Sequence, residues 1–279
     1  MVKVGSGFLA GCALIASLFA GATGAAEKTL TLASTTSTEN SGLFRFLLPP
    51  FEKSTGIKVR VIAAGTGQAI RLARNGDADV LMVHHKPSEE KFVADGFGVK
   101  RNPLMYNDFV IVGPAADQAK IKGLRTATDA FTRIAKSQAL FASRGDESGT
   151  HRAEEGLWKA AGIDRGEASG GWYRELGAGM GATLNAAVAM GAYTLTDRAT
   201  WAAFGNRGSH RILLEGDPLL FNQYSVIMVD PRRHPHVKLA EAWQFVDWLL
   251  AEEGQTRIEE FKINGKQMFF PNAAHPGCE

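Results

Sequence analysis

The stretch Thr29-Leu30-Thr31-Leu32-Ala33-Ser34-Thr35-Thr36-Ser37 changes character halfway along. Its first half alternates Thr and Leu, which is typical of a short strand. Its second half is a run of hydroxyl side chains, and a helical pattern follows from about Glu39 through Phe44 and Leu48. Hydroxyl residues favour helix N-termini, where unpaired backbone N–H groups and the positive end of the helix dipole attract anions. The stretch therefore predicts a strand-to-helix junction suited to an anion, with plain helix capping as the alternative.

Two further junctions rich in hydrogen-bond donors follow along the chain. At Gly65-Thr66-Gly67 the glycines allow a ligand to approach the backbone closely, although an ordinary tight turn would look the same. The segment from Arg144 to Thr150 is the richest, because it combines a planar guanidinium with the hydroxyls of Ser148 and Thr150. Its two acidic residues, Asp146 and Glu147, are expected to orient Arg144 or to cap the next helix. Three such junctions predict a small oxyanion as the ligand.

The composition is that of an ordinary globular protein of one or two domains, with 279 residues of which 45% are hydrophobic and 22% charged. The formal net charge of +2 is too small to indicate nucleic-acid binding, and the basic residues are dispersed. Any anion selectivity must therefore come from a local site. No glycine-rich turn matches a nucleotide-binding motif. We expect a monomer without a cofactor.

Residues 1–26 have the pattern of a cleaved secretory signal peptide. Lys3 is the only charged residue before Glu27, and the apolar run over residues 8–22 is too short for a comfortable membrane span. We therefore expect a periplasmic protein. Leu9-Ala10-Gly11-Cys12 also fits a lipoprotein cleavage box, but the apolar run continues well past it, so a lipid anchor at Cys12 is the less favoured alternative.

Short β-branched runs alternate with helical patterns along the rest of the chain. This alternation predicts an α/β fold with parallel sheets, in which ligands bind at helix N-termini beyond the carboxyl ends of the strands. A helix predicted over residues 239–250 carries a strong apolar stripe and is expected in the core. The other predicted elements are strands over residues 30–33, 58–63, 80–84, 109–112, 138–142, 192–195 and 224–229, and helices over residues 42–55, 67–75, 88–95, 128–137, 149–161 and 180–191.

Two extended segments, residues 108–114 and 221–230, lie far apart in the sequence with a βα block between them. We interpret them as the two crossings of a hinge. The first lobe is then discontinuous, over residues 27–110 and 222–279, and the second lobe covers residues 111–221.

Two histidine groups raise the question of a metal, His84-His85 and His234-Pro235-His236. Adjacent residues of a strand point to opposite faces, and no carboxylate or cysteine set stands at ligand spacing. No metal site is therefore expected.

A periplasmic hydrolase is the alternative from another functional class, with Ser148 or Ser37 as nucleophile and His151 or His84 as base. The chain has no G-x-S-x-G elbow, which counts against it. A purely sensory protein would share the anion site.

Several motifs together resemble the tungstate-binding component of bacterial tungstate-type ABC importers, over nearly all of residues 28–271. The resemblance implies a two-lobed type II periplasmic binding protein, each lobe a mostly parallel sheet flanked by helices, that closes on one tetrahedral oxyanion and delivers it to a membrane permease. The motifs are Ser34-Thr35-Thr36-Ser37-Thr38 with Ser41-Gly42-Leu43, Gly65-Thr66-Gly67-Gln68, Ser143-Arg144-Gly145-Asp146-Glu147-Ser148-Gly149-Thr150-His151 and Ala192-Tyr193-Thr194-Leu195-Thr196-Asp197-Arg198.

The implied function is tungstate capture rather than catalysis, with molybdate or a general oxyanion as the alternative ligand. The family's leading motif usually has Thr where this chain has Ser34, which keeps the hydroxyl. Tyr193 is expected either to reach the cleft or to be buried with its hydroxyl satisfied. The oxyanion ligands that the resemblance implies are Ser34, Thr35, Ser37, Thr66, Arg144, Ser148, Thr150 and Thr194.

Overall fold

The computed structural model describes residues 1–2 and 27–273. The predicted signal segment, the alternative anchor at Cys12 and the C-terminal residues 274–279 lie outside these ranges, apart from residues 1–2. Within the described ranges, every helix is too short or too polar to cross a bilayer.

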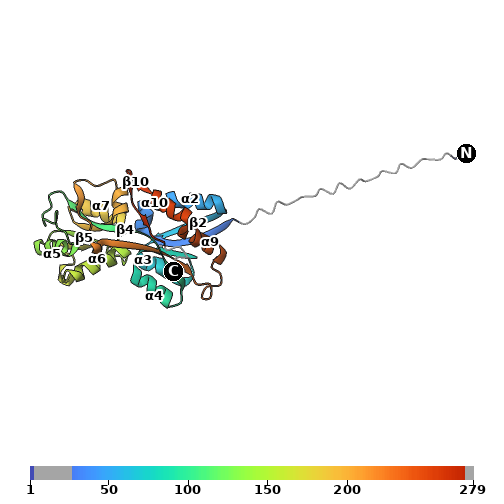
Figure 1. Ribbon diagram of the computed structural model, residues 1–279, viewed down its shortest axis with the longest axis horizontal. Coiled ribbons are helices and arrows are strands. Elements are labelled where there is room, and N and C mark those ends of the chain that lie inside the picture. The colour runs from blue at the N-terminus through green and yellow to red at the C-terminus, as the bar shows by residue number, and fades with distance from the viewer. Residues whose placement is uncertain (3–26, 274–279) are drawn as a thin grey trace.

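Helices gather in two halves of the molecule, with α2, α9 and α10 in one and α5, α6 and α7 in the other (Figure 1). The strands are β1 (Lys28–Thr35), β2 (Ile57–Ala64), β3 (Val80–Val83), β4 (Gly98–Pro114), β5 (Phe141–Ser143), β6 (Tyr173–Glu175), β7 (Thr194–Asp197), β8 (His210–Leu214), β9 (Phe221–Val229), β10 (Lys262–Ile263), β11 (Lys266–Gln267) and β12 (Phe270–Pro271). The helices are α1 (Thr36–Ser41), α2 (Leu43–Thr55), α3 (Thr66–Asn75), α4 (Lys86–Ala94), α5 (Ala127–Ser137), α6 (Gly149–Ala160), α7 (Met180–Met190), α8 (Arg198–Ala203), α9 (Leu239–Leu250) and α10 (Glu252–Glu260).

Each half has its own hydrophobic core. In the first half, aromatic residues of α2 and α9 pack together, with the rings of Phe51 and Phe245 centred 5.0 Å apart. In the second half, α5, β5 and α6 meet around Trp158, whose ring lies 4.2 Å from that of Phe131. The predicted core role of α9 is confirmed, because Phe245 and Leu249 are fully buried.

The sheet that connects these cores is mixed. β1 pairs in parallel with β2 and β3, but β9 pairs antiparallel with both β3 and β4. In the second half β5 and β6 are parallel, whereas β7 and β8 pair antiparallel with β4. The expected α/β architecture is present, but parallel pairing among the described strands occurs only within two groups, β1 with β2 and β3, and β5 with β6. The pairing elsewhere in the sheet is antiparallel, because the chain enters and leaves the second half along the antiparallel strands β4 and β9.

The strands β4 and β9 run between the two halves and pair with each other from Gly98 opposite Val229 to Asp108 opposite Phe221. Beyond Asp108, β4 pairs with β7 and β8 instead. These strands contain the two extended segments that the sequence analysis interpreted as hinge crossings. The strand predicted over residues 109–112 is thus only the end of a much longer one.

The predicted helix over residues 42–55 is present as α2, but the helical pattern expected to begin near Glu39 is divided between α1 and α2. Gly42 has φ +85, a left-handed conformation that ends α1, and α2 begins at the next residue. The helical pattern that starts near Glu39 therefore does not continue unbroken to Leu48. Helix α1 begins at Thr36, directly after β1, so the hydroxyl run straddles the junction of strand and helix.

Candidate anion-binding site

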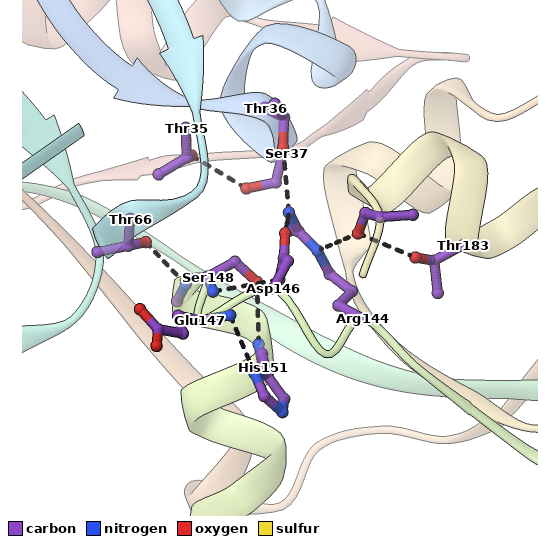
Figure 2. A network of polar contacts seen from close by, with 12 residues as sticks. Thr35, Thr36, Ser37, Thr66, Arg144, Asp146, Glu147, Ser148, His151 and Thr183 are labelled. Atoms are coloured by element: carbon purple, nitrogen blue, oxygen red, sulfur yellow. Dashed lines mark hydrogen bonds and ion pairs between the residues drawn. The ribbon is translucent and has the colours of Figure 1, made fainter. Parts of the chain in front are cut away.

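The N-termini of α1, α3 and α6 meet where the two halves of the molecule face each other (Figure 2). Arg144, just before α6, donates from Nη2 to Thr36 Oγ1 at 3.2 Å. Gly149 at the start of α6 donates its backbone N–H to Thr66 Oγ1 on α3 at 2.7 Å. The three junctions predicted from the sequence are therefore brought together. Three converging helix N-termini give one region a positive potential from backbone dipoles.

The hydroxyl run forms the N-terminus of α1. Thr35 has an extended backbone and accepts a hydrogen bond from the Thr38 backbone N–H at 3.3 Å, so it is the N-cap. Its hydroxyl also lies 3.0 Å from Ser37 Oγ, and Ser37 Oγ in turn lies 3.3 Å from His84 Nε2. Thr35, Ser37 and Thr38 are all buried. The run thus provides a cap and additional buried hydroxyls beside it.

Arg144 is the charged centre of this region, with a side chain that is only 1% exposed. Its Nη2 donates to Asp146 Oδ2 and its Nε to the Ala178 carbonyl at 3.3 Å, whereas Nη1 is buried without a hydrogen-bond partner among the described residues. Burial lowers the pKa of Arg144, and the Asp146 carboxylate opposes that shift. A buried cation with an unpaired donor is an arrangement suited to an anion.

Asp146 orients the segment as expected. Besides its ion pair with Arg144, it accepts a hydrogen bond from the Ser148 backbone N–H at 3.1 Å. Glu147 instead lies at the surface, where its carboxylate is 3.7 Å from Arg71.

The remaining donors come from α3 and α6. Thr150 Oγ1 is buried and has no partner among the residues that the structure describes. Thr66 Oγ1 accepts from Gly149, and Ser148 Oγ accepts from the His151 backbone N–H at 3.2 Å. A hydroxyl that accepts keeps its own proton for another acceptor. These three hydroxyls can therefore donate to a shared ligand.

Two of the residues that the resemblance implied have their protons committed elsewhere. Ser34 Oγ donates to the Met82 carbonyl at 2.6 Å, and Thr194 Oγ1 donates to the Ala142 carbonyl at 2.7 Å. A hydroxyl has one proton, so neither side chain can donate to an anion while these bonds hold. Both bonds stabilise neighbouring strands, and we leave Ser34 and Thr194 out of the proposed donor set.

Of the two expectations for Tyr193, the structure supports burial. Its hydroxyl accepts from the Ala119 backbone N–H and donates to Asp117 Oδ1, both at 2.9 Å. Tyr193 is therefore part of the second half's core.

Sequence reasoning missed Thr36 and His84 as neighbours of this site. Thr36 stands inside the hydroxyl run, and only its contact with Arg144 distinguishes it. His84 was weighed as a metal ligand or a base, and the sequence gives no sign of its contact with Ser37. Among the described residues, no cluster of three or more His, Cys, Asp or Glu side chains is placed to hold a metal ion.

Glu154 on α6 is a buried carboxyl group in the second half that contacts Ser143, the residue before Arg144. Its carboxylate accepts hydrogen bonds from Ser143 Oγ at 2.9 Å, Trp158 Nε1 at 3.1 Å and Tyr173 Oη at 2.8 Å. Burial outweighs these bonds and raises the pKa of Glu154 to about 7.

The raised pKa of Glu154 predicts a pH dependence of stability. Between the ordinary value of 4.5 and about 7, the folded protein binds more protons at this group than the unfolded chain does. The contribution of Glu154 to the free energy of unfolding should therefore fall by about 3 kcal/mol as the pH rises through this window. Burial lowers the pKa values of His84 and His85 to about 4, and these residues contribute a slope of opposite sign below pH 6.5. Urea unfolding at a series of pH values should therefore show the Glu154 slope as a fall in the difference in unfolding free energy between wild type and Glu154→Gln. The difference between wild type and the neighbouring Glu155→Gln should show no such fall, and a constant difference between wild type and Glu154→Gln would contradict this prediction.

A family model described as a PBP superfamily domain matches residues 20–253. This chain belongs to the PBP superfamily. It is 44% identical over 253 residues to the tungstate-binding protein TupA of Peptoclostridium acidaminophilum, and the alignment covers 89% of this chain and 87% of that protein. It is 36% identical over 241 residues to the TupA protein of Campylobacter jejuni, covering 85% of this chain and 88% of that one.

A solved structure agrees with the PBP assignment. The crystal structure of the tungstate ABC transporter from Geobacter sulfurreducens superposes with a TM-score of 0.78 at 49% identity, covering 85% of this chain and 100% of that one. The predicted type II binding-protein fold is thereby confirmed. The family consists of substrate-binding proteins of ABC transporters, which are not enzymes.

The hydrolase alternative is therefore wrong, and the geometry of Ser148 and His151 agrees. Ser148 contacts the backbone of His151, while the His151 ring accepts from the Glu147 backbone N–H at 3.1 Å. That histidine is thus not placed to activate the serine.

Proposed function

We propose that this protein captures tungstate for an ABC importer by closing two lobes over one tetrahedral dianion. The observation that carries the proposal is the buried guanidinium of Arg144, whose Nη1 has no partner among the described residues although it lies where three helix N-termini meet. The likeness to TupA proteins supports tungstate as the anion. The proposed lobes are residues 27–110 with 222–279, and residues 111–221.

The proposed ligands combine a single charge with neutral donors. Arg144 supplies the guanidinium, and hydroxyls from both proposed lobes surround its position. Hydrogen bonds to charged groups contribute about 1.5–3 kcal/mol each, more than neutral pairs, so a few of them dominate the affinity. The hydroxyls of the proposed set are those of Thr35, Ser37, Thr66, Ser148 and Thr150.

The proposed setting is the periplasm. Residues 1–26 would direct export and be removed, leaving a monomer that delivers tungstate to a membrane permease. The names of the relatives, which refer to tungstate binding and to an ABC transporter, support this setting.

Competition calorimetry tests the proposed function. The purified protein is titrated with tungstate, molybdate, sulfate and phosphate in turn, and each weak ligand is then displaced by tungstate. We expect one tungstate per chain, bound at least as tightly as molybdate and far more tightly than the smaller sulfate and phosphate. No heat with tungstate, or tighter binding of phosphate, would overturn the proposal.

The hydroxyl of Thr150 should contribute measurably to this affinity. Thr150→Val removes only the hydroxyl and keeps the shape of the side chain, so it should weaken tungstate binding by roughly ten- to a hundredfold. Thr150→Ser keeps the hydroxyl and should bind within a few-fold of wild type. Equal tungstate affinities of the Val and Ser variants in calorimetry would remove Thr150 from the donor set.

A further inference from the structure

His84 connects the proposed anion site with the strand β9. It follows β3, is 6% exposed, and places Nδ1 2.9 Å from Asn222 Oδ1 and Nε2 3.3 Å from Ser37 Oγ. Its ring stacks on that of Tyr224 with centroids 4.7 Å apart. A Cβ built at Gly149 of α6 would lie only 2.7 Å from His84 Cε1. One buried imidazole thus contacts both halves of the molecule.

The hydrogen bonds of Asn222 fix the tautomer of this imidazole. Asn222 Nδ2 donates to Asn107 Oδ1 at 2.7 Å, so the other end of the amide, Oδ1, faces His84. An amide oxygen only accepts, so the neutral ring carries its proton on Nδ1 and presents a lone pair at Nε2. The hydroxyl of Ser37 is then the donor to Nε2.

This direction of hydrogen bonding points the hydroxyl proton of Ser37 toward His84 and away from an anion in the proposed site. With its proton on His84, Ser37 Oγ is free to accept from Thr35 Oγ1, which lies 3.0 Å away. Adding a proton to Nε2 reverses the direction. The imidazolium would donate to Ser37, and Ser37 and Thr35 would regain their protons for a ligand.

The surroundings keep the imidazole neutral without a ligand. Burial, with smaller contributions from the charges of Arg144 and His85, lowers the pKa of His84 to about 4. Tyr224, stacked on the ring, has a pKa raised well above its ordinary value and is uncharged, and the buried carboxyl of Asp197 faces Tyr224 and Arg144. On α6, Arg152 and Glu155 face the neighbouring His85. A dianion beside Ser37 would add two negative charges near the ring and favour the imidazolium.

On the basis of the proposed function, we propose that His84 takes up a proton when the oxyanion dianion binds, and so positions the hydroxyls of Ser37 and Thr35 as donors. His84 is then a positioning residue, and anion affinity depends on pH. Because the bound state holds the extra proton, affinity falls as the pH rises, by up to about tenfold per pH unit in the window between the free and bound pKa values of His84.

Calorimetry in two buffers tests this proton uptake. Tungstate is titrated into the full protein at pH 7 in Tris and in PIPES, whose protonation enthalpies differ widely, and the difference in binding enthalpy gives the number of protons taken up. We expect close to one proton for wild type. His84→Gln can still accept from Ser37 but cannot titrate, so its uptake should vanish. His85→Gln, the adjacent histidine, should keep the wild-type value.

The possible results separate this inference from the proposed function. Tungstate binding with equal enthalpies in both buffers, or unchanged uptake in His84→Gln, would overturn the role of His84 and leave tungstate capture intact. No binding by the wild type would overturn both. If His84→Gln does not fold, NMR of ring-labelled histidines in the wild type decides the question. We expect His84 to be protonated on Nδ1 alone without tungstate and on both nitrogens with it, and an unchanged ring would overturn the inference.

Discussion

Arg144→Ala is expected to abolish most tungstate binding while the protein stays folded. The guanidinium pairs with Asp146 and also faces the carboxyl groups of Asp197 and Glu154. Its removal leaves the Asp146 carboxylate without its cation, so the variant loses an attraction and gains a repulsion for a dianion. Truncating one partner of a buried charge pair costs about 2–5 kcal/mol, or roughly thirty- to several thousandfold in affinity. Titration calorimetry measures the loss, and circular dichroism checks the fold.

Two controls isolate the geometry of Arg144 from its charge. Arg144→Lys keeps a cation but not the planar fork, so it should fall between wild type and Arg144→Ala. Arg74→Ala removes a cation at the far end of α3, where it pairs with Asp95, and should leave tungstate affinity unchanged. A folded Arg144→Ala protein that binds tungstate as wild type does would disprove the proposed role of Arg144.

Gly149→Ala should impair closure of the proposed lobes. The added methyl would lie 2.7 Å from His84 Cε1 and 3.0 Å from Thr66 Oγ1, contacts that cross between the two halves. Overpacking of this kind costs about 1–3 kcal/mol, so we expect roughly five- to a hundredfold weaker tungstate binding. Small-angle X-ray scattering should also show a smaller contraction on adding tungstate than the wild type shows.

The matched control lies in the same helix. Gly156→Ala adds the same methyl group to α6 at a position where its Cβ meets no atom within 4 Å. It should bind and contract as the wild type does. If both alanine variants behaved alike, the effect would come from the helix itself and not from the contact between the halves.

The sequence predicted the elements that depend on local pattern. Thr35 and Ser148 are the N-caps of α1 and α6. These caps could be predicted because a hydroxyl residue directly before a helical pattern is a local signal. The alternation of strands and helices likewise indicated an α/β fold. The three donor-rich junctions could be located without knowledge of the fold.

What the sequence did not predict depends on residues distant in the chain. The first part of β4 contains Asn102, Pro103 and Asn107, which disfavour a strand, and it is extended because β9 pairs with it. The commitments of the Ser34 and Thr194 hydroxyls to carbonyls on neighbouring strands follow from sheet packing. The contact of His84 with Ser37 joins residues 47 positions apart, and no local pattern reports it.

A crystal structure of the protein with tungstate, in which anomalous scattering locates tungsten, tests the proposed anion site most directly. We expect one strong peak per chain between the halves, with Arg144 Nη1 and Thr150 Oγ1 in hydrogen-bond contact with the oxyanion. A peak at any other place, or an anion that Arg144 does not touch, would contradict this expectation.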